Sequence, residues 1–124
     1  MRLDDLLARL PEDSVASLVL HDADCDIYNI AFLTGDGSLT PRGDMLYFTD
    51  SLLVPDYVPD DQQLSCVIVD GSPASDSLAA LPNVNLCYLR QGANLFACYN
   101  ALQAAFLEDQ ELTGIIRRLL MAHF

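Results

Sequence analysis

NLFACYNALQAAF, residues Asn94–Phe106, is the stretch that decides the fold, because its apolar side chains recur at helical spacing. Four of them fall at i, i+4, i+7 and i+11, the pattern of one amphipathic stripe: Leu95, Tyr99, Leu102 and Phe106. Such a helix needs an apolar surface to pack on. The segments before it have the character of short strands, so we expect the helix to cover one face of a β-sheet.

Runs of apolar, β-branched and aromatic residues predict five strands: Val15–Leu20, Ile27–Leu33, Met45–Thr49, Leu64–Val69 and Asn83–Leu89. Two short helices are predicted at Leu3–Leu10, which Pro11 ends, and at Ala74–Leu81, with Ser72 as N-cap and Pro73 at the first helical position. Strand, helix, strand order in the second half indicates a parallel βαβ unit, while the earlier strands can add antiparallel edges. We predict an α/β fold: a mixed, partly parallel sheet of about five strands with covering helices and an amphipathic C-terminal helix.

A last helix is predicted from about Glu108, and it carries a broad apolar stripe: Leu112, Ile115, Ile116, Leu119, Leu120 and Phe124. We therefore divide the chain into an α/β sensory-type domain at 1–107 and a C-terminal helix at 108–124. This helix has three possible uses: docking on its own sheet, pairing with a second copy, or linking to a following domain. We predict a homodimer that uses these six residues.

The strongly negative charge of the chain argues against several classes of function. The 124 residues include 18 acidic residues and six arginines but no lysine, so the formal net charge is -12. Nucleic acids and anionic membranes are bound through cationic contacts, so this composition argues against both partners. The missing lysine also excludes Schiff-base chemistry, pyridoxal-phosphate attachment and a Walker A loop.

Cysteine and histidine are too dispersed to predict a metal site. The four cysteines form no CxxC pair, and His21 and His123 are isolated, so we expect buried thiols in a reducing compartment. The N-terminus lacks the apolar core of a signal peptide, and no apolar run approaches the roughly 18 residues of a membrane span. We expect a cytoplasmic protein without metal or cofactor.

Three groups of potentially reactive residues have ordinary structural explanations. HDADCD, residues 21–26, resembles the opening of a calcium loop, but Ile27 and Leu33 stand where that loop needs glycine and glutamate, which favours a polar turn. Asp44 and Asp50 flank a strand, as acid–base carboxylates can, yet fifteen aspartates make such a pair expected by chance. Cys25 and His21 have no evident orienting partner, so a nucleophilic pair is not favoured.

Ligand binding without chemistry is better supported. In open α/β sheets ligands bind beyond the carboxyl ends of the parallel strands. The predicted ends carry Thr49, Asp50, Asp70, Gly71 and Arg90, and Arg42 adds a rare cation. These six residues are our candidate ligand site.

Several phrases of the chain resemble the N-terminal domain of PucR-type transcriptional regulators, the purine-catabolism and sugar-diacid regulator-like group. They are LDDLLARLP at Leu3–Pro11, MLYFTDS at Met45–Ser51, CVIVDG at Cys66–Gly71, and NLFACYNALQAAF followed by a helix. Leu95-Phe96 and Asn100-Ala101-Leu102-Gln103 supply most of the family's LFN-x-LQ-x-x-F helix, with three residues inserted between Phe96 and Asn100.

The resemblance implies a non-enzymatic sensory and assembly domain of a transcriptional regulator, which binds a small effector or a partner chain. DNA binding would belong to a helix-turn-helix elsewhere in the protein, and the family supplies no catalytic residues for this region. The alternative is a small hydrolase or transferase that uses aspartates with Arg42 or Arg90.

Overall fold

The computed structural model describes residues 1–33, 39–70 and 75–122, with side chains described through Asp109. The elements in chain order are α1 (Leu3–Leu7), β1 (Val15–Leu20), β2 (Asn29–Leu33), β3 (Met45–Thr49), the 3-10 turn η1 (Ser51–Leu53), β4 (Leu64–Ile68), α2 (Asp76–Ala79), β5 (Val84–Leu89) and α3 (Leu95–Ala122).

The five strands form one sheet in the order β1-β5-β4-β3-β2. β2, β3, β4 and β5 are parallel to one another, and β1 is antiparallel to β5. This confirms the predicted mixed α/β sheet, including the parallel unit β4-α2-β5. The parallel strands follow one another without a reversal of order. The described sheet therefore lacks the switch point at which doubly wound folds open a crevice.

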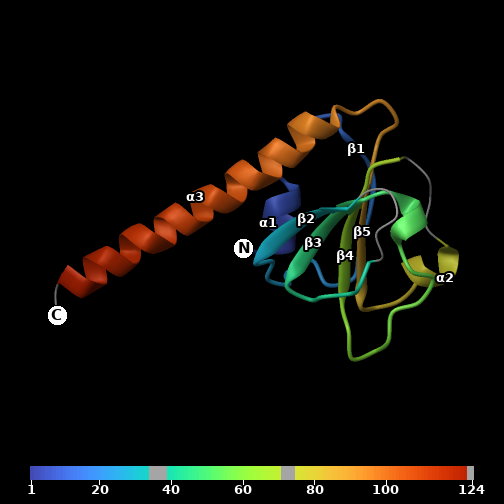
Figure 1. The fold of residues 1–124 in the computed structure, drawn as a ribbon, viewed down its shortest axis with the longest axis horizontal. Helices are drawn as coiled ribbons and strands as arrows, with labels where there is room; N and C mark the ends of the chain where they lie inside the picture. Colours follow the sequence, from blue (N-terminus) through green and yellow to red (C-terminus); the bar gives the residue numbers. More distant parts are fainter. Residues whose placement is uncertain (34–38, 71–74, 123–124) are drawn as a thin grey trace.

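Two apolar layers cover the sheet, one on each face. α1 and α3 lie on the first face, over side chains such as Leu46, Phe48 and Val67, whereas α2 and the loop after η1 cover the second. Alternate residues of one strand supply the two layers: Leu46 and Phe48 point to the first and Tyr47 to the second. Figure 1 shows α1 and α3 on one side of the sheet and α2 on the other.

α3 differs from the expectation because it is one continuous helix of 28 residues, without a break near residue 107. The N-terminus of α3 is capped by Asn94, whose Oδ1 accepts the Ala97 N–H at 3.0 Å. The segment at the expected break, AAFLEDQ, contains neither proline nor glycine and consists largely of good helix formers, so nothing there ends the helix. In Figure 1 the helix leaves the sheet and ends far from it.

The helix before β5 is shorter than predicted. α2 begins at Asp76 rather than Ala74, and its N-cap is Ser75, whose Oγ accepts the Leu78 N–H at 3.3 Å. The predicted cap, Ser72 with Pro73, lies outside the described residues. The strand boundaries agree with the expected ones to within two residues, whereas α1 ends at Leu7 rather than at Leu10.

Candidate functional site

Asp70, one of the predicted site residues, joins the ends of β3 and β4 through Ser51, which was not predicted as a site residue. Both the N–H and the hydroxyl of Ser51 donate to Asp70 Oδ2, at 3.3 and 2.7 Å. Asp50 Oδ1 accepts the Leu52 N–H at 3.2 Å and thereby caps η1. Thr49 is fully buried and donates to the Asp50 carbonyl at 3.3 Å. These bonds tie the loop after β3 to the end of β4, which is an ordinary structural use of the two carboxylates.

The two predicted arginines lie at different edges of the sheet. Arg90 follows β5 at the carboxyl edge, where its Nε donates to the Val15 carbonyl at 3.2 Å. Arg42 precedes β3 at the amino edge and forms an exposed ion pair with Asp44, with 3.1 Å between Nη2 and Oδ2. Arg42 is thus separated from Thr49 by the length of β3. Gly71 lies outside the described residues.

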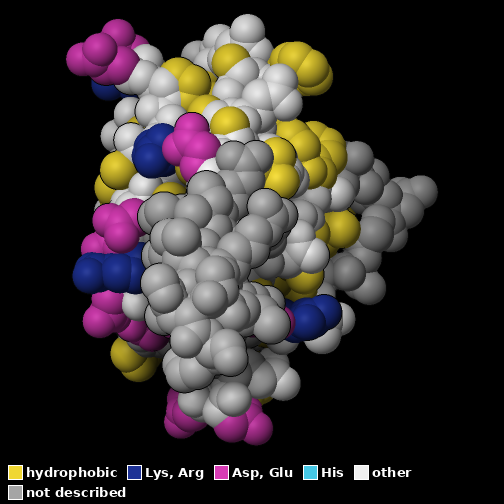
Figure 2. Space-filling view, turned by 90° about the vertical axis from the view of Figure 1, so that its left-hand side faces the viewer, with side chains coloured by type: hydrophobic (Ala, Val, Ile, Leu, Met, Phe, Trp, Pro, Cys, Tyr) yellow, Lys and Arg dark blue, Asp and Glu magenta, His cyan; other side chains and the backbone are white. Residues whose placement is uncertain are grey.

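Concave apolar surface lies on the α3 side of the sheet instead. A pocket with a cavity volume of about 340 Å³ is lined by Phe32 of β2 and by Leu95, Phe96 and Tyr99 from the start of α3. Phe96 is 77% exposed and Phe32 47%, which is unusual for phenylalanine in a folded domain. Figure 2 views the molecule from the side toward which α3 projects. It shows hydrophobic side chains gathered at the upper right and acidic and arginine side chains along the left flank.

Three aromatic rings support this pocket from inside. Phe32 stacks on Phe48 with ring centroids 5.4 Å apart, and Tyr99 meets both rings edge-on at 5.6 and 5.7 Å. Phe48 is fully buried, so it fixes the other two rings to the core. The Tyr99 hydroxyl accepts the Gln103 amide at 3.0 Å, one helical turn along α3. Ring contacts within the domain itself therefore position the pocket wall.

Sequence reasoning did not identify this pocket. Leu95 and Tyr99 were assigned to the packed stripe of the helix, while Phe96 falls off that stripe and Phe32 lies in a run predicted only as a strand. An apolar residue beside the buried stripe is a signal for exposed apolar surface. β2 is an edge strand because of the order of the strands in the sheet, and this order cannot be inferred from the local sequence pattern.

The predicted dimerisation residues lie along the projecting part of α3. The backbone from Leu112 to Leu120 is helical, and Phe124 lies outside the described residues. Toward the projecting part of α3, Glu108 Oε2 forms an exposed ion pair with Arg9 Nη1 of the domain at 3.1 Å. Three residues nearer the start of α3 are buried against the sheet: Cys98, Leu102 and Ala105.

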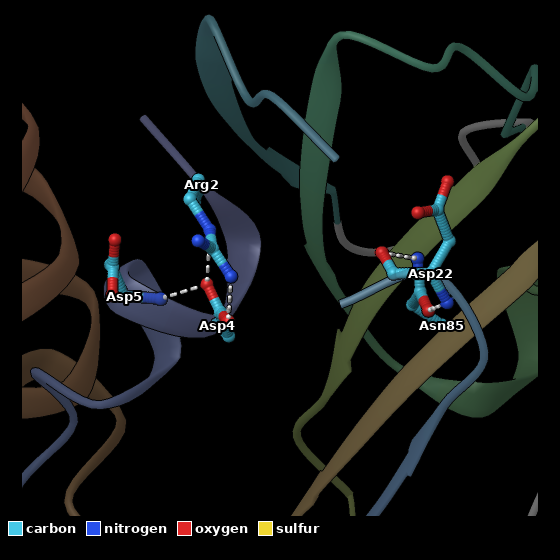
Figure 3. A network of polar contacts seen from close by, with 5 residues as sticks. All are labelled: Arg2, Asp4, Asp5, Asp22 and Asn85. Atoms are coloured by element: carbon cyan, nitrogen blue, oxygen red, sulfur yellow. Dashed lines mark hydrogen bonds and ion pairs between the residues drawn. The ribbon is translucent and has the colours of Figure 1, made fainter. Parts of the chain in front are cut away.

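The aspartate-rich loop at residues 21–26 crosses the amino edge of the sheet and is held by Asn85. The side-chain oxygen of Asn85 accepts the N–H groups of His21 and Asp22 at 3.0 and 2.9 Å. Its amide group donates to the Asp22 carbonyl and to Ser65 Oγ, both at 3.2 Å. Figure 3 shows Asp22 beside Asn85, and on the nearby helix α1 the separate contacts of Arg2, Asp4 and Asp5. This is the polar turn that the sequence favoured over a calcium loop.

Metal and thiol chemistry find little support in the described geometry. Among the described side chains, which are those of residues 1–33, 39–70 and 75–109, no three of His, Cys, Asp or Glu are grouped so that they could hold a metal ion. His21 Nε2 lies 2.8 Å from the Ala79 carbonyl, whereas Cys25 Sγ lies 3.9 Å from Ser65 Oγ. Burial raises the pKa of Cys25, and still more that of Cys66, which disfavours the reactive thiolate.

Comparison of the chain with protein-family models, with curated proteins and with solved structures gave no match. In the part of the chain that the structure describes, no helix combines the length and the hydropathy needed to cross a bilayer.

Proposed function

We propose that this chain is a non-enzymatic regulatory module, the sensory and assembly domain of a PucR-like transcriptional regulator that works in the cytoplasm as a homodimer. The observation that carries the proposal is α3, a helix anchored on the sheet at one end and extending well beyond it at the other. A small effector or a partner chain would bind the α/β domain, and α3 would join two copies.

The anchored end of α3 belongs to the core. Cys98 and Leu102 are fully buried, and Phe106 packs beside them at the edge of the same layer. At 1.5 Å per residue the helix is about 42 Å long, whereas the five-residue strands beneath it span about 17 Å. More than half of α3 therefore extends past the strands that its first turns cover.

The projecting end has the sequence of a paired helix. Leu112, Ile116 and Leu119 continue the same alternating spacing of three and four residues that buries Cys98, Leu102 and Ala105 in the domain. Isolated helices shorter than about 12–15 residues are marginal in water, so a partner surface along this stripe would stabilise the extension. A second copy supplies an identical stripe, as two-stranded coiled coils require.

The alternative is a small hydrolase or transferase built on aspartates and an arginine. Such a site needs a carboxylate and a guanidinium that converge on one substrate position. Arg42 is paired with Asp44 at the amino edge, and Arg90 bonds backbone at the carboxyl edge. This separation supports a binding module over the enzyme.

The test is the molar mass of two variants by light scattering after gel filtration. Ile116→Asp puts a charge in the apolar stripe and is expected to weaken the dimer by at least about tenfold. Gln110→Asp adds the same charge to the projecting helix outside the stripe and is expected to leave the dimer intact. Circular dichroism of both variants reports whether the domain stays folded.

Equal masses for Ile116→Asp and the unmodified chain would contradict assembly through this stripe. Turnover of a substrate that is lost on replacing a single aspartate or arginine by alanine would contradict the non-enzymatic assignment.

A further inference from the structure

We propose that the pocket between β2 and the start of α3 is a binding site for a small, uncharged, planar aromatic molecule. The site consists of Phe32, Leu95, Phe96 and Tyr99. This inference adds a ligand to the proposed regulatory function. The regulatory role of the ligand rests on that proposed function. Binding itself follows from the shape and chemistry of the pocket.

The size and the walls of the pocket select flat rings. Its volume of about 340 Å³ is at the small end of the range for ligand pockets, which suits one ring or two fused rings. Three of the four described lining side chains are aromatic, and stacked or edge-on contacts between rings stabilise beyond simple burial. Phe32 and Tyr99 are already oriented against Phe48, so little conformational freedom is lost when a ring enters.

The charge of the chain disfavours an anionic ligand in this pocket. None of the four lining residues that the structure describes is charged, and the whole chain carries a formal net charge of -12. An aromatic carboxylate would lose its hydration without gaining a cation, and it would be repelled over a distance of about a Debye length. An uncharged ring meets neither cost.

The position of the pocket connects a ligand to the helix that the proposed function uses. Leu95, Phe96 and Tyr99 lie in the first turns of α3, and Phe32 lies in the edge strand of the sheet. A ring bound here would contact both elements at the point where α3 is anchored. Its binding energy would therefore favour one placement of α3 on the sheet, which is the requirement for a ligand to shift a conformational equilibrium.

The test uses the whole chain labelled with ¹⁵N and titrated with indole as an uncharged planar probe. We expect saturable amide shifts centred on Phe32 and Leu95–Tyr99, with a dissociation constant on the order of 1 mM, as for a ligand of this size. Indole-3-carboxylate, which carries the same ring with a negative charge, is expected to bind at least about tenfold more weakly. The chain has no tryptophan, so indole fluorescence gives an independent reading.

Two variants locate the site. Phe96→Ala removes one wall and, because Phe96 is 77% exposed, leaves the core intact; it is expected to weaken indole binding by about tenfold. Leu107→Ala is the matched control, because Leu107 is a half-exposed apolar residue of the same helix that does not line the pocket. Leu107→Ala is expected to bind indole as the unmodified chain does.

Three results would overturn the proposal: the absence of saturable shifts, shifts centred on Asp50 and Asp70 at the carboxyl edge, or equal binding by Phe96→Ala and Leu107→Ala. The dimer is measured separately by molar mass. A chain that binds indole but stays monomeric would support the pocket and contradict the assembly role of α3. A dimer that does not bind indole would support the assembly role and contradict the pocket.

Discussion

Replacing Asn85 by alanine should destabilise the fold more than any other single change to a polar side chain that we describe. Asn85 is 1% exposed, and its amide accepts two backbone N–H groups and donates to a carbonyl and a hydroxyl. Through these bonds the connection from β1 to β2 is fastened to the start of β5. Alanine removes these four bonds, together with the longer contact of the amide with Cys25 Sγ at 3.9 Å, and supplies nothing in their place.

The magnitude follows from the count of bonds. A typical hydrogen bond contributes about 1 kcal/mol net, and water can reach part of the loop once Asn85 is gone, so we expect a loss of about 3 kcal/mol. That is a large share of the roughly 5–15 kcal/mol by which small domains are stable. With a urea m value of about 2 kcal/mol/M, the unfolding midpoint should fall by about 1.5 M.

The assay is equilibrium urea unfolding followed by circular dichroism, with Asn100→Ala as control. Asn100 is an exposed residue of α3, so its replacement should change stability by less than about 0.5 kcal/mol. Asn85→Asp keeps one oxygen but buries a carboxylate where the amide donated, and it should lose at least as much as Asn85→Ala. A midpoint for Asn85→Ala equal to that of Asn100→Ala would refute the reasoning.

Three further predictions concern the core, a turn and the thiols. Leu102→Ala empties a fully buried position under α3 and should cost about 2–5 kcal/mol in urea unfolding; a loss below about 1 kcal/mol would contradict the packing. Gly92→Ala places a side chain at φ 85°, so a loss of about 1 kcal/mol is expected, whereas unchanged stability would show that the turn relaxes. Burial raises the pKa of the Cys87 thiol from 9.0 to about 12. The stability that the neutral Cys87 thiol contributes is therefore fully present below about pH 9 and is lost as the pH rises toward about 12. The urea midpoint should decrease from about pH 8 to about pH 10, and a constant midpoint would contradict this prediction.

The fold class could be predicted because its signals are local. Val15–Leu20 and Met45–Thr49 are strands with the predicted bounds, since each is a short apolar run next to turn residues. The stripe through Leu102 correctly indicated a helix packed on a sheet. The continuity of α3 was not predicted, because residues 94–106 and the stripe after Glu108 were assigned to separate helices, although no residue between them ends a helix.

The candidate site was harder to predict, because it depends on which segments become neighbours. Asp70 bonds to Ser51, the neighbour of Asp50, because β3 and β4 pair in parallel and end at the same edge. Arg42 precedes its strand, so it lies at the opposite edge. The aromatic pocket needs β2 at the edge of the sheet and α3 above it, and this arrangement follows from strand order rather than from any residue pattern.

Sedimentation velocity of the unmodified chain over a range of concentrations tests most directly whether α3 assembles this module. One chain has a mass of 13.6 kDa. We predict a species of two chains that gives way to one chain on dilution. A single-chain mass at every concentration would contradict the assembly role of α3.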